Sequence, residues 1–304
     1  MEHPVQGNYV ALPTPFRKGR VDQECFERLI ERVADLGADG ILVAGTTGEV
    51  PTLNDYEHRS LIRCAVEASR ERVSVLAGIG TNCTRSSVDL ARFATEAGVN
   101  AVMVITPYYN RPSRKGLLLH FGHVADATDL PVVLYNVPKR TGLDLLPEVA
   151  AELAARHDNI VAIKETSLSI ERVRRLVKST DLAVLCGEDS LIFEYGVAGA
   201  VGAISTVANL VPRHVSGILR GACNQRDLRV ARELQDELET LNVALALETN
   251  PVPLKSALAA LQLCMPDVRL PLAPLEAENH RKLRVTLRNS PAIYSLNAAP
   301  VELE

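Results

Sequence analysis

The sequence predicts an α/β protein, a (β/α)8 barrel of the TIM type that continues into a C-terminal helical appendage. Short apolar runs alternate with amphipathic segments over roughly the first two thirds of the chain. Such alternation is typical of a parallel sheet with helical crossovers. The pattern repeats eight times, which suits a closed barrel better than an open doubly wound sheet. No G-x-G-x-x-G motif follows the first strand, which disfavours a dinucleotide-binding fold.

The predicted strands are short runs rich in valine, isoleucine and leucine, as in parallel strands that are covered by helices. Glycine, proline or polar residues bound most of them. The eight strands are predicted over Asn8–Leu12, Asp39–Val43, Arg72–Ile79, Asn100–Ile105, Pro131–Tyr135, Ile160–Lys164, Leu182–Cys186 and Gly199–Ser205.

The segments between the strands repeat apolar residues every three or four positions, which indicates amphipathic helices. In the first of them, Phe26, Leu29 and Val33 share one face and Gly37 ends the pattern. Helices are predicted over Asp22–Leu36, Asp55–Ser69, Thr84–Ala97, Lys115–Ala127, Leu146–Ala155, Ser169–Lys178 and Ser190–Val197.

Beyond the eighth strand the pattern is helical only. We therefore expect a barrel over residues 1–208, a helical region over residues 209–289 and a tail without periodicity over residues 290–304. The helices predicted in this region cover Val211–Ala222, Arg226–Ala246, Pro251–Leu261 and Leu275–Arg288.

The composition excludes several classes of protein. The 304 residues are 47% hydrophobic and 23% charged, with a net charge of −4, which is ordinary for a globular protein. No long basic run predicts nucleic-acid binding, and no apolar stretch predicts a membrane span or a signal peptide. We therefore expect a cytoplasmic protein. The six cysteines are scattered without a C-x-x-C pair, so we expect reduced core thiols and no metal site.

The chemistry of such a barrel lies at the carboxyl ends of its strands. Lys164 ends the sixth strand. Taken alone, it is more simply a surface lysine. Burial would favour the neutral amine, which attacks ketones to form a Schiff base. The other strand ends favour this second interpretation, because they carry hydroxyls, glycines and one arginine. The residues of interest are Thr46, Thr47, Tyr109, Tyr135, Arg140, Gly187 and Ile204.

These groups fit Schiff-base catalysis on a 2-oxo acid. The hydroxyls of Thr47, Tyr109 and Tyr135 would form a proton relay. Thr46, Thr47 and nearby backbone N–H groups would hold a carboxylate. Arg140 would clamp a second carboxylate with its two-pronged guanidinium.

The glycine-rich segments have simpler interpretations. Gly45–Glu49 is a tight strand–helix turn in preference to a phosphate loop, because it lacks the lysine of a P-loop. Gly196, Gly199 and Gly202 indicate close backbone packing in preference to a phosphate site.

Other residues also have plain structural interpretations. Tyr108 and Tyr109 are commonly packing residues when adjacent, and Arg140 is commonly a surface residue. His58 is expected on the surface, and Glu49 is expected to accept hydrogen bonds from the N–H groups of its own loop. None of the candidate residues is decisive alone, but the occurrence of these polar residues at successive strand ends favours catalysis.

In these motifs the chain resembles the dihydrodipicolinate synthase and N-acetylneuraminate lyase superfamily of lysine-dependent class I aldolases, and most of all its dihydrodipicolinate synthase branch. The resemblance runs from Gly7 to about Asn289, and several unrelated positions match in order. The matching segments are Gly45–Glu49, Pro107–Tyr109, Tyr135–Pro138, Arg140–Gly142, Ile163–Glu165, Ile204–Ser205, Ala208–Asn209, Glu248–Lys255 and Arg269–Leu272.

The resemblance implies a reaction. Lys164 would condense with pyruvate to an imine, and the derived enamine would add to an aldehyde, which in this branch is aspartate 4-semialdehyde. No cofactor is implied besides the covalent imine on Lys164. Arg140 would bind the carboxylate of the aldehyde. Since sugar-acid members tend to lack an arginine there, Arg140 favours a small carboxylated aldehyde.

The resemblance also implies an assembly. Tyr135 would be the central acid and base, and Thr47 with a Tyr109 from a neighbouring subunit would complete the relay. The homo-oligomer would usually be a tetramer built as a dimer of dimers. Thr46, Thr47 and the Ile204 carbonyl would line the pyruvate end, and Gly187 would also bind substrate.

Two alternatives remain at this point, because a fold does not fix a substrate. One is another Schiff-base aldolase, dehydratase or deaminase that acts on hydroxy-2-oxo acids or sugar acids. The other is a barrel without catalysis that binds a keto acid. The presence of Lys164, Tyr135, Thr47 and Tyr109 argues against the second.

One departure from the family predicts weak or absent inhibition by lysine. In lysine-inhibited members the effector lies at a subunit interface near residues equivalent to Asn82, His58 and Tyr108, which are present here. The acidic residue expected one turn into the next helix is replaced by Ser86. An α-amino group needs an anionic or acceptor partner. We expect nearly full activity when the enzyme is titrated with millimolar lysine, and strong inhibition in that assay contradicts the prediction.

Overall fold

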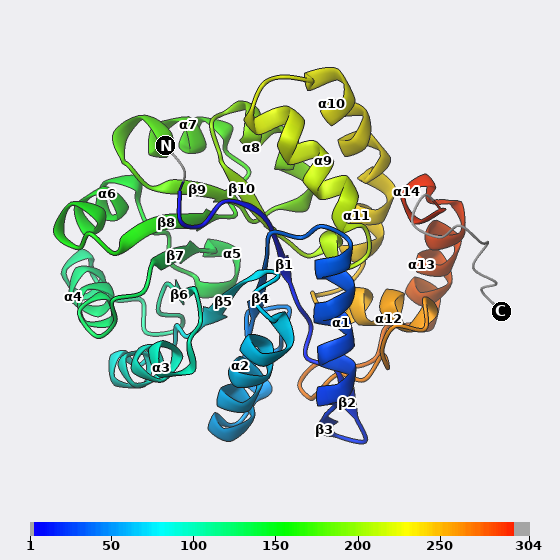
Figure 1. Ribbon diagram of the computed structural model, residues 1–304, viewed down its shortest axis with the longest axis horizontal. Coiled ribbons are helices and arrows are strands. Elements are labelled where there is room, and N and C mark those ends of the chain that lie inside the picture. The colour runs from blue at the N-terminus through cyan, green and yellow to red at the C-terminus, as the bar shows by residue number, and fades with distance from the viewer. Residues whose placement is uncertain (1–2, 295–304) are drawn as a thin grey trace.

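The computed structural model, which describes residues 3–294, contains a closed barrel of parallel strands with helices around it (Figure 1). The predicted (β/α)8 fold is confirmed. The barrel closes between β1 and β10, where Gly7 pairs with Gly202. The barrel strands are β1 (Gly7–Ala11), β4 (Gly40–Val43), β5 (Ser74–Gly78), β6 (Ala101–Ile105), β7 (Val132–Asn136), β8 (Ile160–Glu165), β9 (Ala183–Cys186) and β10 (Gly202–Ser205).

The helices around the barrel follow the predicted pattern closely, and two of them, α2 and α3, have the predicted bounds. Local signals explain this agreement. Asn54 and Glu57 form a reciprocal capping box at the start of α2, and Gly98 ends α3 with φ +82°. These helices are α1 (Gln23–Asp35), α2 (Asp55–Ser69), α3 (Thr84–Ala97), α4 (Arg114–Ala125), α6 (Pro147–Arg156), α7 (Ile170–Ser179) and α8 (Ile192–Val197).

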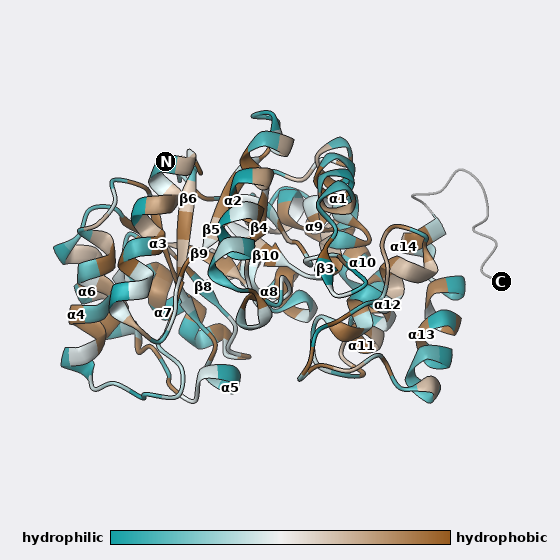
Figure 2. Cartoon of the chain, turned by 90° about the horizontal axis from the view of Figure 1, so that it is seen from below, coloured by the Kyte–Doolittle hydropathy of each residue, from teal (hydrophilic) through white to brown (hydrophobic). Residues whose placement is uncertain are grey.

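Two apolar layers hold the barrel together. Alternate residues of each strand face its interior or the helices. Val133 and Ala162 belong to the interior cluster, whereas Leu134 and Ile163 pack in the outer layer beneath the helices. Figure 2 shows the apolar strands enclosed by helices with hydrophilic outer faces. Residues two positions beyond Val133 and Ala162 therefore also point inward, at the barrel mouth.

The C-terminal region is helical as predicted, except that the helix expected over Arg226–Ala246 is wrong. The chain forms two helices there because the Leu238 N–H bonds to the Gln235 carbonyl three residues back, which breaks the α-helical ladder. The helices of this region are α9 (Pro212–Cys223), α10 (Leu228–Glu237), α11 (Glu239–Leu245), α12 (Val252–Ala260), α13 (Ala277–Asn289) and α14 (Pro291–Tyr294).

The sequence also missed short elements. The antiparallel pair β2 (Phe16–Arg17) and β3 (Arg20–Val21) follows β1, and the single turn α5 (Pro138–Thr141) follows β7. Of the predicted tail, α14 packs with Ala292 and Ile293 buried, and residues 295–304 lie outside the described part of the chain.

Helix α9 packs against the barrel as the helix that follows β10. The buried Asn8 side chain on β1 donates to the Pro212 carbonyl at 3.0 Å and to the Ser216 hydroxyl at 3.1 Å, both on α9. We therefore propose that the barrel extends through Cys223 instead of ending at residue 208.

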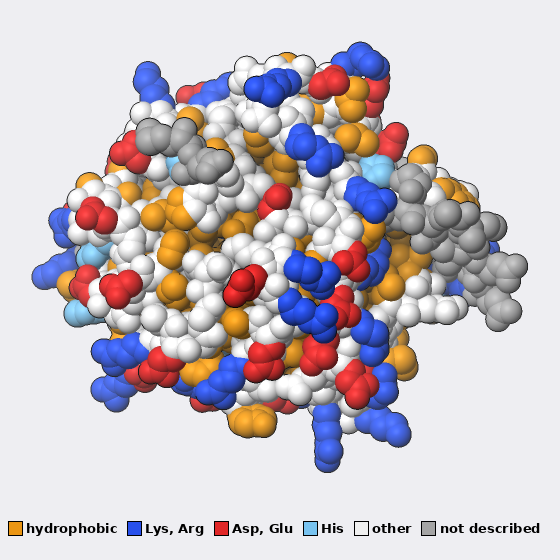
Figure 3. All heavy atoms as spheres, viewed as in Figure 1, with side chains coloured by type: hydrophobic (Ala, Val, Ile, Leu, Met, Phe, Trp, Pro, Cys, Tyr) orange, Lys and Arg blue, Asp and Glu red, His pale blue; other side chains and the backbone are white. Residues whose placement is uncertain are grey.

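The expectation that the cysteines are reduced core thiols is confirmed only in part. All six cysteines are free thiols, and Cys25, Cys64 and Cys186 are buried, but Cys83 is exposed, so it is not a core thiol. Positive and negative side chains are interspersed over the helices on the face seen in Figure 3. Within residues 3–294, no helix is long and apolar enough to cross a membrane.

A buried ion pair joins the barrel to the C-terminal region. Lys255 on α12 is fully buried, and its ammonium group binds the Glu49 carboxylate and the Asp267 carbonyl, the latter at 2.7 Å. The second Glu49 oxygen accepts the Arg269 N–H at 3.1 Å. The expectation that Glu49 is held by its own loop is therefore wrong. Its partners come from more than 200 residues away, where no local pattern reveals them.

Replacing Lys255 with methionine leaves the Glu49 carboxylate buried without its counter-ion. We expect Lys255→Met to lower the free energy of unfolding by about 3–5 kcal/mol. Chemical denaturation followed by circular dichroism measures this. The matched control is Lys282→Met, because Lys282 pairs with Glu278 on the surface of α13, and little change is expected there. Equal stability of Lys255→Met and the wild type contradicts the prediction.

Candidate active site

A cavity of about 780 Å³ lies at the carboxyl ends of the strands, and residues of α5, α10 and α11 also line it. It brings together residues from five strand ends, those of β4, β7, β8, β9 and β10. Most of the predicted site residues line it, namely Thr46, Thr47, Tyr135, Arg140, Lys164 and Gly187. Ile204 and Tyr109 do not line this cavity.

Lys164 lies at the inner end of the cavity against Tyr135. The two residues are paired across β7 and β8, so both side chains point into the barrel. Lys164 is only 7% exposed, and its Nζ lies 4.5 Å from the centroid of the Tyr135 ring. The amine is therefore held next to the ring while still in contact with the cavity.

The residue after Lys164 fixes the end of β8. Glu165 is fully buried, and its carboxylate accepts from Arg172 Nε at 2.8 Å and from the backbone N–H of Thr166 at 3.0 Å. Asn136, at the end of β7, donates to the same carboxylate at 3.1 Å. This hydrogen-bonded network holds the two neighbouring strand ends, and with them Lys164, in one position.

Gly187 makes room for the Lys164 side chain. A Cβ atom built on Gly187 would lie 2.7 Å from Lys164 Cε and 2.6 Å from Thr166 Cγ2. Both distances are below van der Waals contact, so a larger residue there displaces the lysine. The backbone N–H of Gly187 donates to the Glu165 carbonyl at 2.9 Å, and this hydrogen bond fixes the position of the glycine.

The loop Gly45–Glu49 is a tight turn, as the preferred interpretation predicts. The Glu49 N–H bonds to the Thr46 carbonyl at 3.1 Å, and Ala44 and Glu49 both have positive φ angles, near +56° and +53°. Within residues 3–294, the N–H groups of Thr46 and Thr47 donate to no protein acceptor. Two such donors facing a cavity suit a carboxylate.

Asn250 is a site residue that the sequence reasoning did not single out. Its amide donates to Thr47 Oγ1 at 2.9 Å, and it lines the cavity from the C-terminal region. Because Thr47 accepts this hydrogen bond, its own hydroxyl proton is left to donate elsewhere. The feature of the sequence that could have indicated Asn250 is the Asn-Pro pair in the family-like segment Glu248–Lys255. No direct hydrogen bond joins the Thr47 and Tyr135 hydroxyls in the described chain.

Tyr109 lies apart from the other predicted site residues. It is 91% exposed, with φ +70°, and the Asn110 N–H bonds back to the Tyr108 carbonyl at 2.8 Å around it. This is a strained three-residue turn. The Asn110 amide also donates to the Asn82 carbonyl at 2.9 Å. The turn therefore holds an aromatic hydroxyl outward, away from its own cavity.

The cavity mouth carries groups of both charges. Arg140 is exposed on α5 and lines the cavity, as does Glu188. Burial is the main cause that raises the pKa of Glu188, and the neighbouring Asp189 adds to it. Asp189 accepts the N–H groups of Thr206 and Val207 at 3.0 and 2.7 Å.

A second cavity of about 660 Å³ shares Thr46, Tyr135, Arg140 and Asn250 with the first. His58 lines it and is buried, so the expectation of a surface residue is wrong. Its Nε2 lies 2.8 Å from the Gly78 carbonyl, which provides the polar partner that burial requires. Burial also lowers the His58 pKa.

The glycines near β10 pack closely, as expected. A Cβ on Gly196 would lie 2.7 Å from Ala222 Cβ, and one on Gly202 would lie 2.4 Å from the Gly7 carbonyl oxygen. The described residues hold no group of three or more His, Cys, Asp or Glu side chains placed to bind a metal ion.

Comparisons with known proteins agree with this geometry. A family model, the dihydrodipicolinate synthetase family, matches residues 4–290. A 4-hydroxy-tetrahydrodipicolinate synthase of Nitratidesulfovibrio vulgaris is 43% identical over 280 residues, which cover 91% of this chain and 96% of the relative. These findings confirm the resemblance seen in the sequence.

Solved structures agree as well. The dihydrodipicolinate synthase structure from Aquifex aeolicus is 42% identical, with a TM-score of 0.92 over 94% of this chain and 99% of that one. A structure described as a monomeric dihydrodipicolinate synthase variant is 37% identical, with a TM-score of 0.91 over 94% of this chain and 97% of that one.

The contact between Gly187 and Lys164 predicts the effect of adding one methyl group. We expect Gly187→Ala to displace the lysine amine and to reduce reductive trapping of pyruvate by about 10²-fold, because the new Cβ overlaps Lys164 Cε. Mass spectrometry after borohydride treatment measures this. The control is Gly116→Ala, in the first turn of α4 and outside the cavity lining, where trapping is expected to stay unchanged. Wild-type trapping by Gly187→Ala contradicts the prediction.

Proposed function

Since the chain belongs to the dihydrodipicolinate synthetase family, we propose that it is a 4-hydroxy-tetrahydrodipicolinate synthase. It is a Schiff-base-forming lyase that condenses pyruvate with aspartate 4-semialdehyde. The observation that carries this proposal is the buried amine of Lys164 beside the Tyr135 ring, inside a cavity that Arg140 also lines. These are the nucleophile, the acid/base and the carboxylate clamp that the reaction needs.

In the first half of the reaction, the Lys164 amine attacks the keto carbon of pyruvate. Tyr135 gives a proton to the carbinolamine oxygen, which leaves as water, and an imine remains. Loss of a proton from the methyl group converts the imine into an enamine. Thr47 contributes its hydroxyl proton to the relay that reprotonates Tyr135, since the hydrogen bond from Asn250 leaves that proton available.

In the second half, the enamine carbon attacks the aldehyde carbon of the semialdehyde and a carbon–carbon bond forms. The aldehyde oxygen takes up a proton and becomes a hydroxyl. The amino group of the substrate then attacks the imine carbon, which closes the ring and releases the Lys164 amine. No cofactor is needed besides the covalent imine, because the protonated imine itself withdraws electrons from the methyl carbon.

Two anion sites orient the substrates. The N–H groups of Thr46 and Thr47 hold the pyruvate carboxylate near Lys164, with Gly187 and the Ile204 carbonyl at the same end. Arg140, at the cavity mouth, binds the carboxylate of the semialdehyde in a bidentate pair. The guanidinium of Arg140 favours an aldehyde that carries its own carboxylate over the hydroxylated chains of sugar acids.

The site is completed by a second copy of the chain. Tyr109 is exposed on its own chain and lies outside its own cavity. We place it in the relay of a neighbouring subunit, within a homo-oligomer that is a tetramer built as a dimer of dimers. The enzyme acts in the cytoplasm on small molecules, without nucleic-acid or membrane partners.

Reductive trapping tests the proposed function. With pyruvate and borohydride, Lys164 is expected to carry one added carboxyethyl group, which peptide mass spectrometry locates. Lys164→Ala is expected to form no adduct. A panel of aspartate 4-semialdehyde, 4-hydroxy-2-oxoglutarate and sugar acids then identifies the substrate. Absence of an adduct refutes Schiff-base chemistry, whereas an adduct with faster turnover of another panel member refutes the proposed aldehyde.

Mixing two inactive variants tests the shared site. Lys164→Ala lacks the nucleophile, and Tyr109→Phe is expected to lower kcat by about 10²-fold or more because it removes a relay proton. When the two are unfolded together and refolded, mixed dimers hold one site with an intact Lys164 and an intact Tyr109 from the other chain. Activity is expected to return in the mixture. No recovery in mixed oligomers shows that Tyr109 acts within its own chain.

A further inference from the structure

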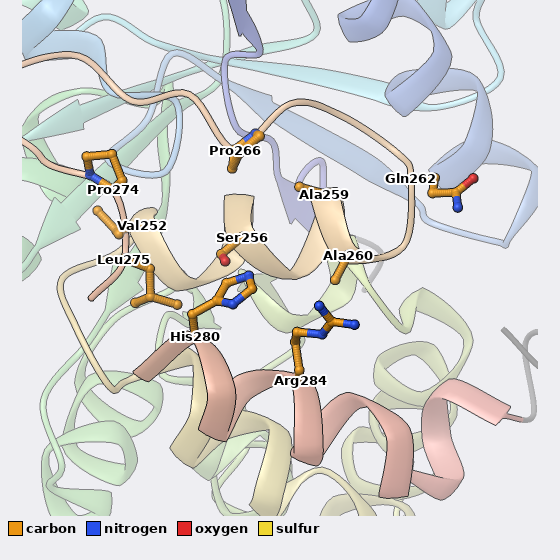
Figure 4. Close-up of a pocket in the computed structure, with 10 residues that line it drawn as sticks. All are labelled: Val252, Ser256, Ala259, Ala260, Gln262, Pro266, Pro274, Leu275, His280 and Arg284. Atoms are coloured by element: carbon orange, nitrogen blue, oxygen red, sulfur yellow. The ribbon is translucent and has the colours of Figure 1, made fainter. Parts of the chain in front are cut away.

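A third cavity, of about 680 Å³, lies between α12, α13 and the segment that connects them (Figure 4). It shares no lining residue with the two cavities at the barrel mouth. Ser256 of α12 lines it, whereas the adjacent Lys255 points to the barrel and binds Glu49. The cavity is therefore a separate space on another side of α12.

Arg284 gives this cavity a positive charge without a counter-ion. Its neighbours three and four positions away on α13 are His280, Arg281, Leu287 and Arg288, none of which is acidic. By contrast, Lys282 on the same helix pairs with Glu278 at 2.7 Å. No carboxylate of the described chain pairs with Arg284, and no Asp or Glu lines the cavity.

Arg284 is half-buried, so its lack of an acidic partner matters for ligand binding. A guanidinium that is partly removed from water gains from a bound anion, because the anion replaces the hydration that burial removes. Figure 4 shows His280 and Arg284 pointing from α13 toward α12, where Ser256 and Ala260 face them. Ser256 is a buried residue, but its hydroxyl oxygen keeps some exposure and has no hydrogen-bond partner among residues 3–294. Three donors therefore surround one space.

Apart from the exposed Gln262, the rest of the lining is apolar. Small and branched side chains and two prolines form the walls, so a ligand with a hydrocarbon part can bury it there. The volume lies within the range of small-molecule sites, roughly 300–1,000 Å³. The apolar lining residues are Val252, Ala259, Ala260, Pro266, Pro274 and Leu275.

We propose that this cavity binds a small monocarboxylate with a short hydrocarbon chain. The Arg284 guanidinium holds the carboxylate in a bidentate pair, and the Ser256 hydroxyl and the His280 ring donate further hydrogen bonds. The hydrocarbon chain lies against Val252 and Leu275. A single guanidinium matches the single charge of a carboxylate better than the double charge of a phosphate.

Isothermal titration of the full-length protein with hexanoate tests this proposal. We expect saturable binding, at least tenfold weaker binding to Arg284→Gln, and unchanged binding to Arg281→Gln. Arg281 is the matched control because it is exposed on the same helix and does not line the cavity. Hexanamide has the same chain without the charge, and we expect no binding from it. Binding of hexanamide equal to that of hexanoate overturns the proposal.

Hexanoate also carries the charge that Arg140 recognises at the barrel mouth, so Arg140→Gln distinguishes the two sites. We expect Arg140→Gln to bind hexanoate like the wild type. Loss of binding in Arg140→Gln with retention in Arg284→Gln places hexanoate at the barrel mouth and overturns the proposal. Wild-type binding by both variants also overturns it. His280→Gln, with a weaker expected loss, serves as a second variant if Arg284→Gln does not fold.

Discussion

The structure depends on the buried ion pair between Glu49 and Lys255. Both side chains are fully enclosed, and burial lowers the Lys255 pKa while the Glu49 charge opposes that shift. The Asp267 carbonyl and the Arg269 N–H satisfy the remaining hydrogen bonds. A buried pair with these additional partners is costly to break. It therefore fixes the C-terminal helices against the barrel.

This ion pair matters for chemistry because of what lies next to it in the chain. Glu49 ends the turn that carries Thr46 and Thr47, and Lys255 lies five residues after Asn250, which donates to Thr47. The ion pair that joins the two regions thus also fixes the positions of the hydrogen-bond donors Thr46, Thr47 and Asn250 in the cavity. On the opposite side, the Glu165 network holds Lys164.

Much of this arrangement was accessible from the sequence, because parallel strands end at one edge. Apolar runs and capping residues located the strands and most helices, and strand order then placed Tyr135 beside Lys164. The contacts of Glu49 with Lys255 and of Thr47 with Asn250 join residues more than 200 positions apart. Periodicity reports only local faces, so it predicts neither these contacts nor the burial of His58.

The Tyr109 turn links catalysis to assembly. A positive φ at a tyrosine costs on the order of 1–3 kcal/mol and persists where other contacts impose it. The hydrogen bonds of Asn110 hold the turn, yet they leave the aromatic ring 91% exposed. In the proposed oligomer the partner subunit covers that ring. This proposal gives the strain a physical offset, namely burial of the ring in the subunit interface, and it makes formation of the relay depend on association of the subunits.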